Sequence, residues 1–175
     1  MKHFIPTALL LLSAVSSCDN GVQPREYGQG DGYEIYSLVL KEDFDSSSIL
    51  IVLRDSNVTT IRSADSTQAA YLRNNLPGLL DETIAHFISA NDNPAKLDYI
   101  HGAYHLVLSR DYVDSSAGPA VQLGISRVRY DKFGTQAIVE VGELFAPLAG
   151  SGSLSFLVRE NGEWKIRGRV MTWIS

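Results

Sequence analysis

The last third of the chain alternates apolar and polar residues with a period of two, and this pattern constrains the fold more than any other feature. Three runs are expected to be strands, with apolar positions at Ala137, Val139, Val141 and Phe145; at Leu154, Phe156 and Val158; and at Trp164, Ile166 and Val170. Asp131–Gly134 and Glu160–Gly162 have the length and composition of hairpin turns. Consecutive strands with short turns predict an antiparallel meander. Gln136 and Glu140 on the alternate positions predict that one face of it is solvated.

Helices are expected before the meander. Residues 33–44 have the three- and four-residue apolar spacing of a short amphipathic helix, with Asp31 as its N-cap. Residues 66–91 are expected to form two helical pieces separated by Pro77-Gly78, because proline and glycine interrupt helices.

Shorter strands are expected over residues 49–55, 104–113 and 121–130, where β-branched and aromatic residues lie between turn-forming residues. The predicted fold class is therefore α+β, with N-terminal helices packed on one face of a curved antiparallel sheet that ends in the three-strand meander. Residues 33–175 are expected to form a single globular domain.

The first 17 residues have the composition of a cleaved export signal. Lys2 gives a positive start, and the apolar run over residues 5–15 spans about 11 residues, too short for a bilayer core that needs about 20. Small residues follow that run directly. Short apolar runs with this ending are typical of signal peptides, so we expect residues 1–17 to be removed.

The run Val15-Ser16-Ser17-Cys18 resembles the lipobox of bacterial lipoproteins, in which the cysteine thiol receives diacylglycerol before cleavage. The new amino terminus usually receives a further acyl chain such as palmitate, and two or three chains anchor a protein stably in a bilayer. The resemblance implies that Cys18, the only cysteine in the chain, is lipid-anchored. An ordinary signal-peptidase site, with Ala14 and Ser16 as its small residues, is the alternative.

Asp19, the residue after the anchor, resembles the signal that keeps enterobacterial lipoproteins at the inner membrane. It favours the periplasmic face of the inner membrane over the outer membrane. The segment 18–32 is rich in glycine and has too little apolar surface to fold, so we expect a flexible tether there. Because Cys18 has no second cysteine to pair with, an intramolecular disulfide is excluded.

The charge balance argues against nucleic acid as a partner. Removing residues 1–17 leaves 14 basic and 20 acidic residues, a net charge of −6. Nucleic-acid affinity comes largely from basic side chains that neutralise phosphates, so an acidic domain is a poor match. The charge is unevenly distributed: residues 122–175 contain 7 basic and 5 acidic residues, whereas residues 18–121 contain 7 and 15.

A basic stripe is the least ordinary feature of the C-terminal part. Lys165, Arg167 and Arg169 alternate along the last predicted strand, opposite its apolar residues, and Arg159 in the preceding strand extends the stripe. Near a membrane, such a stripe is a candidate site for anionic headgroups or an acidic partner. The simpler interpretation, which we favour, is a solvated sheet face on which lysine and arginine discourage edge pairing.

Two histidine arrangements are candidates for chemistry. His101 and His105 lie four residues apart with Asp98 nearby, but on the predicted strand the two imidazoles would stand about 13 Å apart, too far to share a metal ion. Glu82 and His86 have the spacing of a helical pair that could act as an acid and a base, although an ordinary surface pair is the favoured interpretation. We therefore expect no metal site, no cofactor and no catalytic residue.

Three segments near the C-terminus resemble a group of uncharacterised bacterial exported proteins and lipoproteins. They are residues 125–142 (ISRVRYDKFGTQAIVEVG), 149–166 (AGSGSLSFLVRENGEWKI) and 170–175 (VMTWIS). The resemblance implies an exported domain and brings no known activity. A weaker likeness, to cone-shaped folds of the NTF2 type, implies a pocket between helices and sheet, and a likeness of fold alone does not assign a function.

The sequence therefore predicts a membrane-anchored envelope lipoprotein with a non-enzymatic domain that binds a small ligand or an envelope protein. The alternative is a hydrolase or isomerase with a small pocket between helices and sheet, using Glu82, His86 or His105. Two or more titratable side chains converging in one pocket would favour the enzyme.

Overall fold

The structure is a computed structural model that describes residues 29–44, 49–61, 66–98, 100, 105–111, 120–146 and 149–175. The helices are α1 (Gln29–Phe44), α2 (Ser66–Asn75) and α3 (Asp81–Asn91), with a short 3₁₀ helix η1 (Ser109–Asp111). The strands are β1 (Leu50–Leu53), β2 (Leu106–Leu108), β3 (Ala120–Ile125), β4 (Arg129–Tyr130), β5 (Gln136–Ala146), β6 (Ala149–Glu160) and β7 (Glu163–Ile174). Within these ranges the three α-helices and the seven-stranded sheet fit the predicted α+β class.

The sheet is mixed, which corrects the expectation of an antiparallel sheet. Its strand order is β2-β1-β3-β5-β6-β7, and β4 pairs with β5 beside this path. β1 is parallel to both β2 and β3, while every other pair is antiparallel. Parallel neighbours need a long crossover connection. The chain provides one, since α2 and α3 lie between β1 and β2 in the sequence.

The predicted meander is confirmed, because β5, β6 and β7 are consecutive antiparallel neighbours. The β6–β7 turn has positive φ at Asn161 (53°) and Gly162 (87°). Two consecutive residues with positive φ characterise the type I′ turn, whose twist matches that of the flanking strands. In the β4–β5 hairpin, buried Asp131 accepts the N–H groups of Thr135 at 2.6 Å and Gln136 at 2.9 Å.

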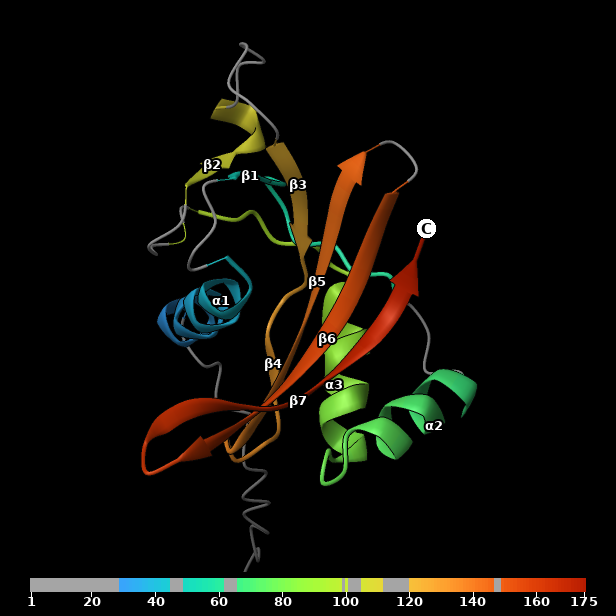
Figure 1. Ribbon diagram of the computed structural model, residues 1–175. Helices are drawn as coiled ribbons and strands as arrows, with labels where there is room; N and C mark the ends of the chain where they lie inside the picture. Colours follow the sequence, from blue (N-terminus) through green and yellow to red (C-terminus); the bar gives the residue numbers. More distant parts are fainter. Residues whose placement is uncertain are drawn as a thin grey trace, which may run out of the picture.

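Both faces of the sheet are covered, which corrects the prediction of helices on one face and solvent on the other. Figure 1 shows α1 on one side of the sheet and α2 with α3 on the opposite side. The α1-side core includes Tyr36, Leu40, Leu53, Leu123, Val139, Val141 and Leu157. The α3-side core includes Leu72, Leu76, Ile84, Phe87, Ile138, Leu154, Phe156 and Val170. Burying one such large side chain contributes about 1.5–3 kcal/mol, so each core supplies substantial stability.

An irregularity in β7 moves its residues between these faces. The β6–β7 register shifts between Phe156 and Leu157, which pair with Gly168 and Ile166, so Arg167 is the extra residue of a bulge. Trp164 and Ile166 therefore pack in the α1-side core, while Val170 packs in the α3-side core. The prediction that these three residues share one face is wrong, because one inserted residue reverses the alternation.

The predicted helices are present in the structure, but the first of them begins earlier than expected. α2 and α3 are separate helices with Pro77 and Gly78 between them, as predicted, and Gly78 has a φ of 90°. α1 begins at Gln29, so Asp31 lies inside the helix instead of capping it, and the last four residues of the expected tether are helical. None of the helices in the described ranges is long and apolar enough to span a membrane.

The three shorter predicted strands cover fewer residues than expected, and within 49–55 only Leu50–Leu53 is a strand. Over 104–113 only Leu106–Leu108 is a strand, and η1 follows it directly. Over 121–130 the strand is divided into β3 and β4 by residues 126–128. There the backbone N–H of Ser126 donates to the carbonyl oxygen of Glu140, which brings this linker against the middle of β5.

Candidate functional site

A pocket of about 200 Å³ opens on the α3-side face of the sheet, over the C-terminal half of β5. The segment that follows β1, residues 54–60, forms one wall. Alternate residues of β3 and β5, including Gly124, Glu140 and Gly142, form the floor, and Trp173 of β7 closes the far side. The pocket therefore brings together three parts of the chain that are distant in sequence.

A row of glycines makes room on this floor. Gly124 of β3 pairs with Gly142 of β5, which pairs with Gly152 of β6, which in turn pairs with Trp173 of β7. Four neighbouring strands thus place three glycines and one tryptophan side by side in register. Without Cβ atoms on three of these positions, the sheet surface is flat enough for other side chains to lie directly on it.

The indole of Trp173 lies over this glycine row. A Cβ atom at Gly152 would stand 1.9 Å from the indole Nε1, and one at Gly142 would stand 3.1 Å from Cζ2. A Cβ at Gly150 would stand 3.1 Å from Cη2 of the same ring. Trp173 is partly buried, and its Nε1 is a buried donor with no acceptor in the described part of the chain. Because these glycines have no side chains, the ring can lie directly against the sheet, where it also lines the pocket.

Glu140 is the buried acid of the pocket, with 2% of its surface exposed. Its Oε2 accepts the hydroxyl of Thr59 at 2.5 Å and the backbone N–H of Thr60 at 2.8 Å. Its Oε1 accepts the hydroxyl of Thr172 at 2.7 Å and that of Thr60. The carboxylate thus joins β5 to the wall segment and to the end of β7.

These donors determine what Glu140 can do chemically. A carboxylate has about four acceptor positions, and four protein donors fill them here. A general base needs a lone pair within reach of a substrate proton, and Glu140 has none left over. Glu140 therefore acts as the hydrogen-bonding anchor of the pocket wall.

Arg54 and Gln122 are exposed side chains at the rim of the pocket. The backbone N–H of Arg54 donates to Leu123 of β3 at 2.9 Å, which fixes the start of the wall segment against the sheet. The guanidinium of Arg54 has no hydrogen bond or ion pair with any residue that the structure describes. It is therefore available to a ligand.

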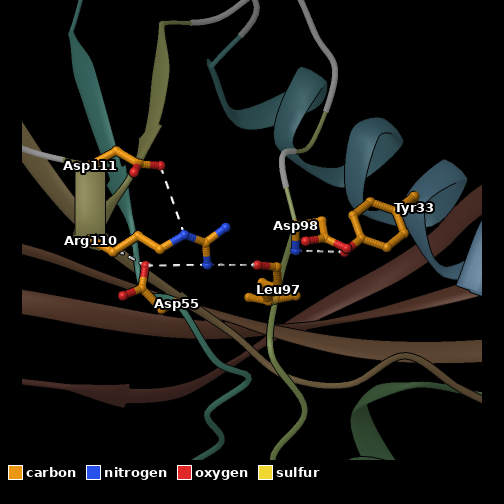
Figure 2. Close-up of polar contacts among 6 residues, drawn as sticks. All are labelled: Tyr33, Asp55, Leu97, Asp98, Arg110 and Asp111. Carbon is orange, nitrogen blue, oxygen red and sulfur yellow. Dashed lines mark hydrogen bonds and ion pairs between the residues drawn. The ribbon is translucent and has the colours of Figure 1, made fainter.

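Arg110 of η1 lies beyond the C-terminal ends of the parallel strands β1 and β2 and is held by neighbouring groups. Its guanidinium lies 4.0 Å from Asp55 and 3.9 Å from Asp111, and its Nη1 donates to the carbonyl oxygen of Leu97 at 3.3 Å (Figure 2). The backbone N–H of Arg110 also donates to Asp55 at 3.0 Å. These contacts tie the ends of β1 and β2 to the segment after α3, so they are structural.

A second polar cluster lies on the α1 side of the sheet. Arg169 of β7 donates to the carboxylate of Asp43 and, at 3.4 Å, to the carbonyl oxygen of Val39, both on α1. Burial raises the pKa of Asp43 above its ordinary value, and the bond from Arg169 partly offsets this. Burial, followed by the nearby charge of Asp43, also raises the pKa of Glu143. Two carboxyl groups thus lie close to one guanidinium.

The predicted basic stripe is not continuous in the structure. Arg169 is directed to α1, while Lys165 and Arg167 lie 3.2 Å and 3.9 Å from Glu160 beside the hairpin turn. Arg159 donates to the carbonyl oxygen of Gly162 and lies 5.6 Å from the ring centre of Trp164. The bulge at Arg167 separates these residues, so they form two sites with internal partners.

The proposed Glu82–His86 pair is not formed. Glu82 accepts the backbone N–H of Lys132 at 3.0 Å and lies 3.7 Å from its ammonium group. His86 places Nδ1 3.3 Å from the carbonyl oxygen of Tyr130. Each side chain of the pair therefore has a partner in the β4–β5 hairpin instead.

The histidine pair is described only in part. His101 lies outside the described residues, and His105 is exposed. The backbone N–H of Asp98 donates to the hydroxyl of Tyr33 at 2.8 Å (Figure 2). No group of three or more histidine, cysteine or acidic side chains with metal-binding geometry occurs in the described ranges. Cys18 and Asp19, the predicted anchor and sorting residues, also lie outside these ranges.

The pocket residues were not among the candidates that the sequence indicated. Glu140 was expected on a solvated face, and Trp173 had no assigned role. The signal that was available is the coincidence of glycines at 142, 150 and 152 with a tryptophan near the end of the next strand. Glu140 is separated from Thr59 and Thr60 by about eighty positions in the sequence, so no local sequence pattern indicated these contacts.

Comparison of the chain with protein-family models, curated proteins and solved structures finds no match.

Proposed function

We propose that this chain is a bacterial lipoprotein whose domain, held at an envelope membrane by acylated Cys18, binds a small ligand or a partner protein and performs no catalysis. The anchor follows from the lipobox-like run that ends at Cys18, and Asp19 favours the periplasmic face of the inner membrane. The resemblance of residues 125–142 to exported proteins and lipoproteins supports the same location.

The observation that carries the binding role is the hydrogen bonding of Glu140. An enzyme of the hydrolase or isomerase class needs a titratable group that exchanges protons with a substrate. Among the described residues, Glu140 is the only acid that lines the pocket, and its four acceptor positions are filled by Thr59, Thr60 and Thr172. A concave site with a fixed polar anchor, an aromatic wall and an exposed cation is suited to binding.

The anchor is tested with Cys18→Ala in cells that are fed a labelled fatty acid. The wild-type protein is expected in the membrane fraction with the label, and the variant is expected to lack the label and to leave that fraction. Ser17→Ala is the matched control, since it keeps a small residue before the cysteine and should leave labelling unchanged. Continued membrane association of unlabelled Cys18→Ala protein would refute the anchor.

A further inference from the structure

We infer that the pocket binds a small ligand in which a carboxylate is joined to a flat apolar ring, with Arg54 binding the carboxylate and Trp173 contacting the ring. The inference rests on the proposed binding function and specifies the ligand.

The position and freedom of Arg54 indicate an anion. The other arginines in the described ranges all have partners, among them Arg73 with Asp81, Arg127 with a carbonyl oxygen, and Arg169 with Asp43. Arg54 is exposed at the pocket rim, and its guanidinium has no partner among the described residues. A guanidinium presents a planar fork of donors that fits a carboxylate with two parallel hydrogen bonds.

Glu140 does not neutralise this cation. Its two oxygens accept four hydrogen bonds from threonine hydroxyls and one backbone amide, and no ion pair with Arg54 is formed. The same saturation disfavours a neutral ligand with many hydroxyl groups, such as a sugar, because the buried acceptor of the pocket is already occupied. A ligand that brings its own hydrogen-bond acceptors fits the unpaired guanidinium of Arg54 better.

Trp173 and the pocket size indicate the rest of the ligand. The ring is held against Gly142 and Gly152 and also lines the pocket, so it offers a fixed aromatic surface for stacking. A pocket of about 200 Å³ is smaller than the usual range for drug-sized ligands, about 300–1,000 Å³. It has room for one ring with a short acidic arm. Such a group is found in a free aromatic acid and at the end of a peptide with an aromatic C-terminal residue.

The test follows the indole N–H resonances of the mature lipidated protein, which begins at Cys18, in detergent. The chain has only two tryptophans, so the ¹⁵N-labelled protein gives two indole signals, and Trp173→Phe identifies the signal from the pocket. The probes are phenylacetate, its neutral analogue phenylacetamide, the peptide Gly-Gly-Phe and the same peptide with a C-terminal amide.

Phenylacetate is expected to move the Trp173 signal and leave the Trp164 signal in place, with an affinity at least about tenfold higher than that of phenylacetamide. Arg54→Gln is expected to remove this preference. Arg73→Gln, the same change on the exposed surface of α2, is expected to retain it. A stronger effect of the free-acid peptide than of phenylacetate would identify a chain terminus as the source of the carboxylate, and the reverse would identify a free acid.

Three outcomes would overturn the inference. Equal affinity for the acid and the amide, or an unchanged preference in Arg54→Gln, would refute the anionic ligand while leaving a binding pocket in place. No movement of the Trp173 signal with any of the four probes would refute the ligand class and remove the support that this pocket gives to the proposed function.

Discussion

Trp173 of β7 lies directly opposite Gly152 of β6, and its indole occupies the space in which a side chain at position 152 would stand. The arrangement continues across the sheet, because Gly142 pairs with Gly152 and also lies beneath the ring. The strands therefore place an aromatic side chain flat on the sheet at the edge of a pocket. The shape of this pocket therefore depends on the glycines at positions 142 and 152.

Gly152→Ala tests this packing. The new methyl group would overlap the indole, whose Nε1 lies 1.9 Å from the position of the added Cβ, so the ring has to move away. Overpacking of this kind typically lowers the free energy of unfolding by about 1–3 kcal/mol. Urea unfolding measures the change. Gly32→Ala is the control, because a Cβ at this position in α1 would stand 4.0 Å from Cγ2 of Val128, an ordinary van der Waals contact, and alanine favours a helix. Equal stability of the Gly152 variant and wild type would contradict the packing.

Glu140→Gln tests the carboxylate anchor. The amide provides one acceptor oxygen in place of two, so the hydroxyl and N–H donors of Thr60, Thr59 and Thr172 cannot all remain paired. Leaving buried donors unpaired is expected to lower the unfolding free energy by about 1–3 kcal/mol. Glu163→Gln makes the same change at an exposed position of β7 and should alter stability by less than about 0.5 kcal/mol. Unfolding of the two variants at the same urea concentration would contradict the anchoring role of Glu140.

Glu143→Gln tests the acid pair on the α1 side. Folding raises the pKa of Glu143 above its ordinary 4.5, so the folded state binds the proton more tightly than the unfolded chain does. The contribution of this group to stability is therefore highest below pH 4.5 and falls as the pH rises through the raised pKa. Urea titrations at several pH values should show a smaller decline for Glu143→Gln than for wild type. Parallel curves for the two proteins would show that the pKa is not raised.

Asp19→Ser tests the sorting signal. If the aspartate keeps the lipoprotein at the inner membrane of an enterobacterial host, the serine variant should appear mainly in the outer-membrane fraction of a density gradient. Asn20→Ser, a similar change one residue later, should leave the protein where the wild type is found. An unchanged distribution for Asp19→Ser would remove the sorting role and leave the anchor at Cys18 untouched.

Local patterns predicted the elements whose causes are local. Pro77 and Gly78 separate α2 from α3 as expected, and Asn161-Gly162 forms the β6–β7 turn because these residues tolerate positive φ. The apolar run around Leu50–Leu53 is a buried strand, as its composition indicates. In each case neighbours in the sequence decide the structure.

The remaining features depend on contacts between distant residues. The extra residue at Arg167 reverses the alternation of β7, and this sends Arg169 to Asp43 on α1 and breaks the predicted basic stripe. Glu140 lies at a polar position of the alternating pattern and was expected in solvent, yet Thr59 and Thr172 surround it with donors. A pattern of polar and apolar residues does not distinguish a solvated carboxylate from a buried one with partners.

The central proposal is that this domain works at a membrane surface, held there by Cys18. The most direct measurement is the intact mass of the protein purified from cell membranes, with fragmentation of its amino terminus. We predict a chain that begins at Cys18 and carries the added mass of diacylglycerol and a further acyl chain. A chain that begins at Ser17 without lipid, as cleavage after Ser16 would give, or one that retains Met1, would contradict the proposal.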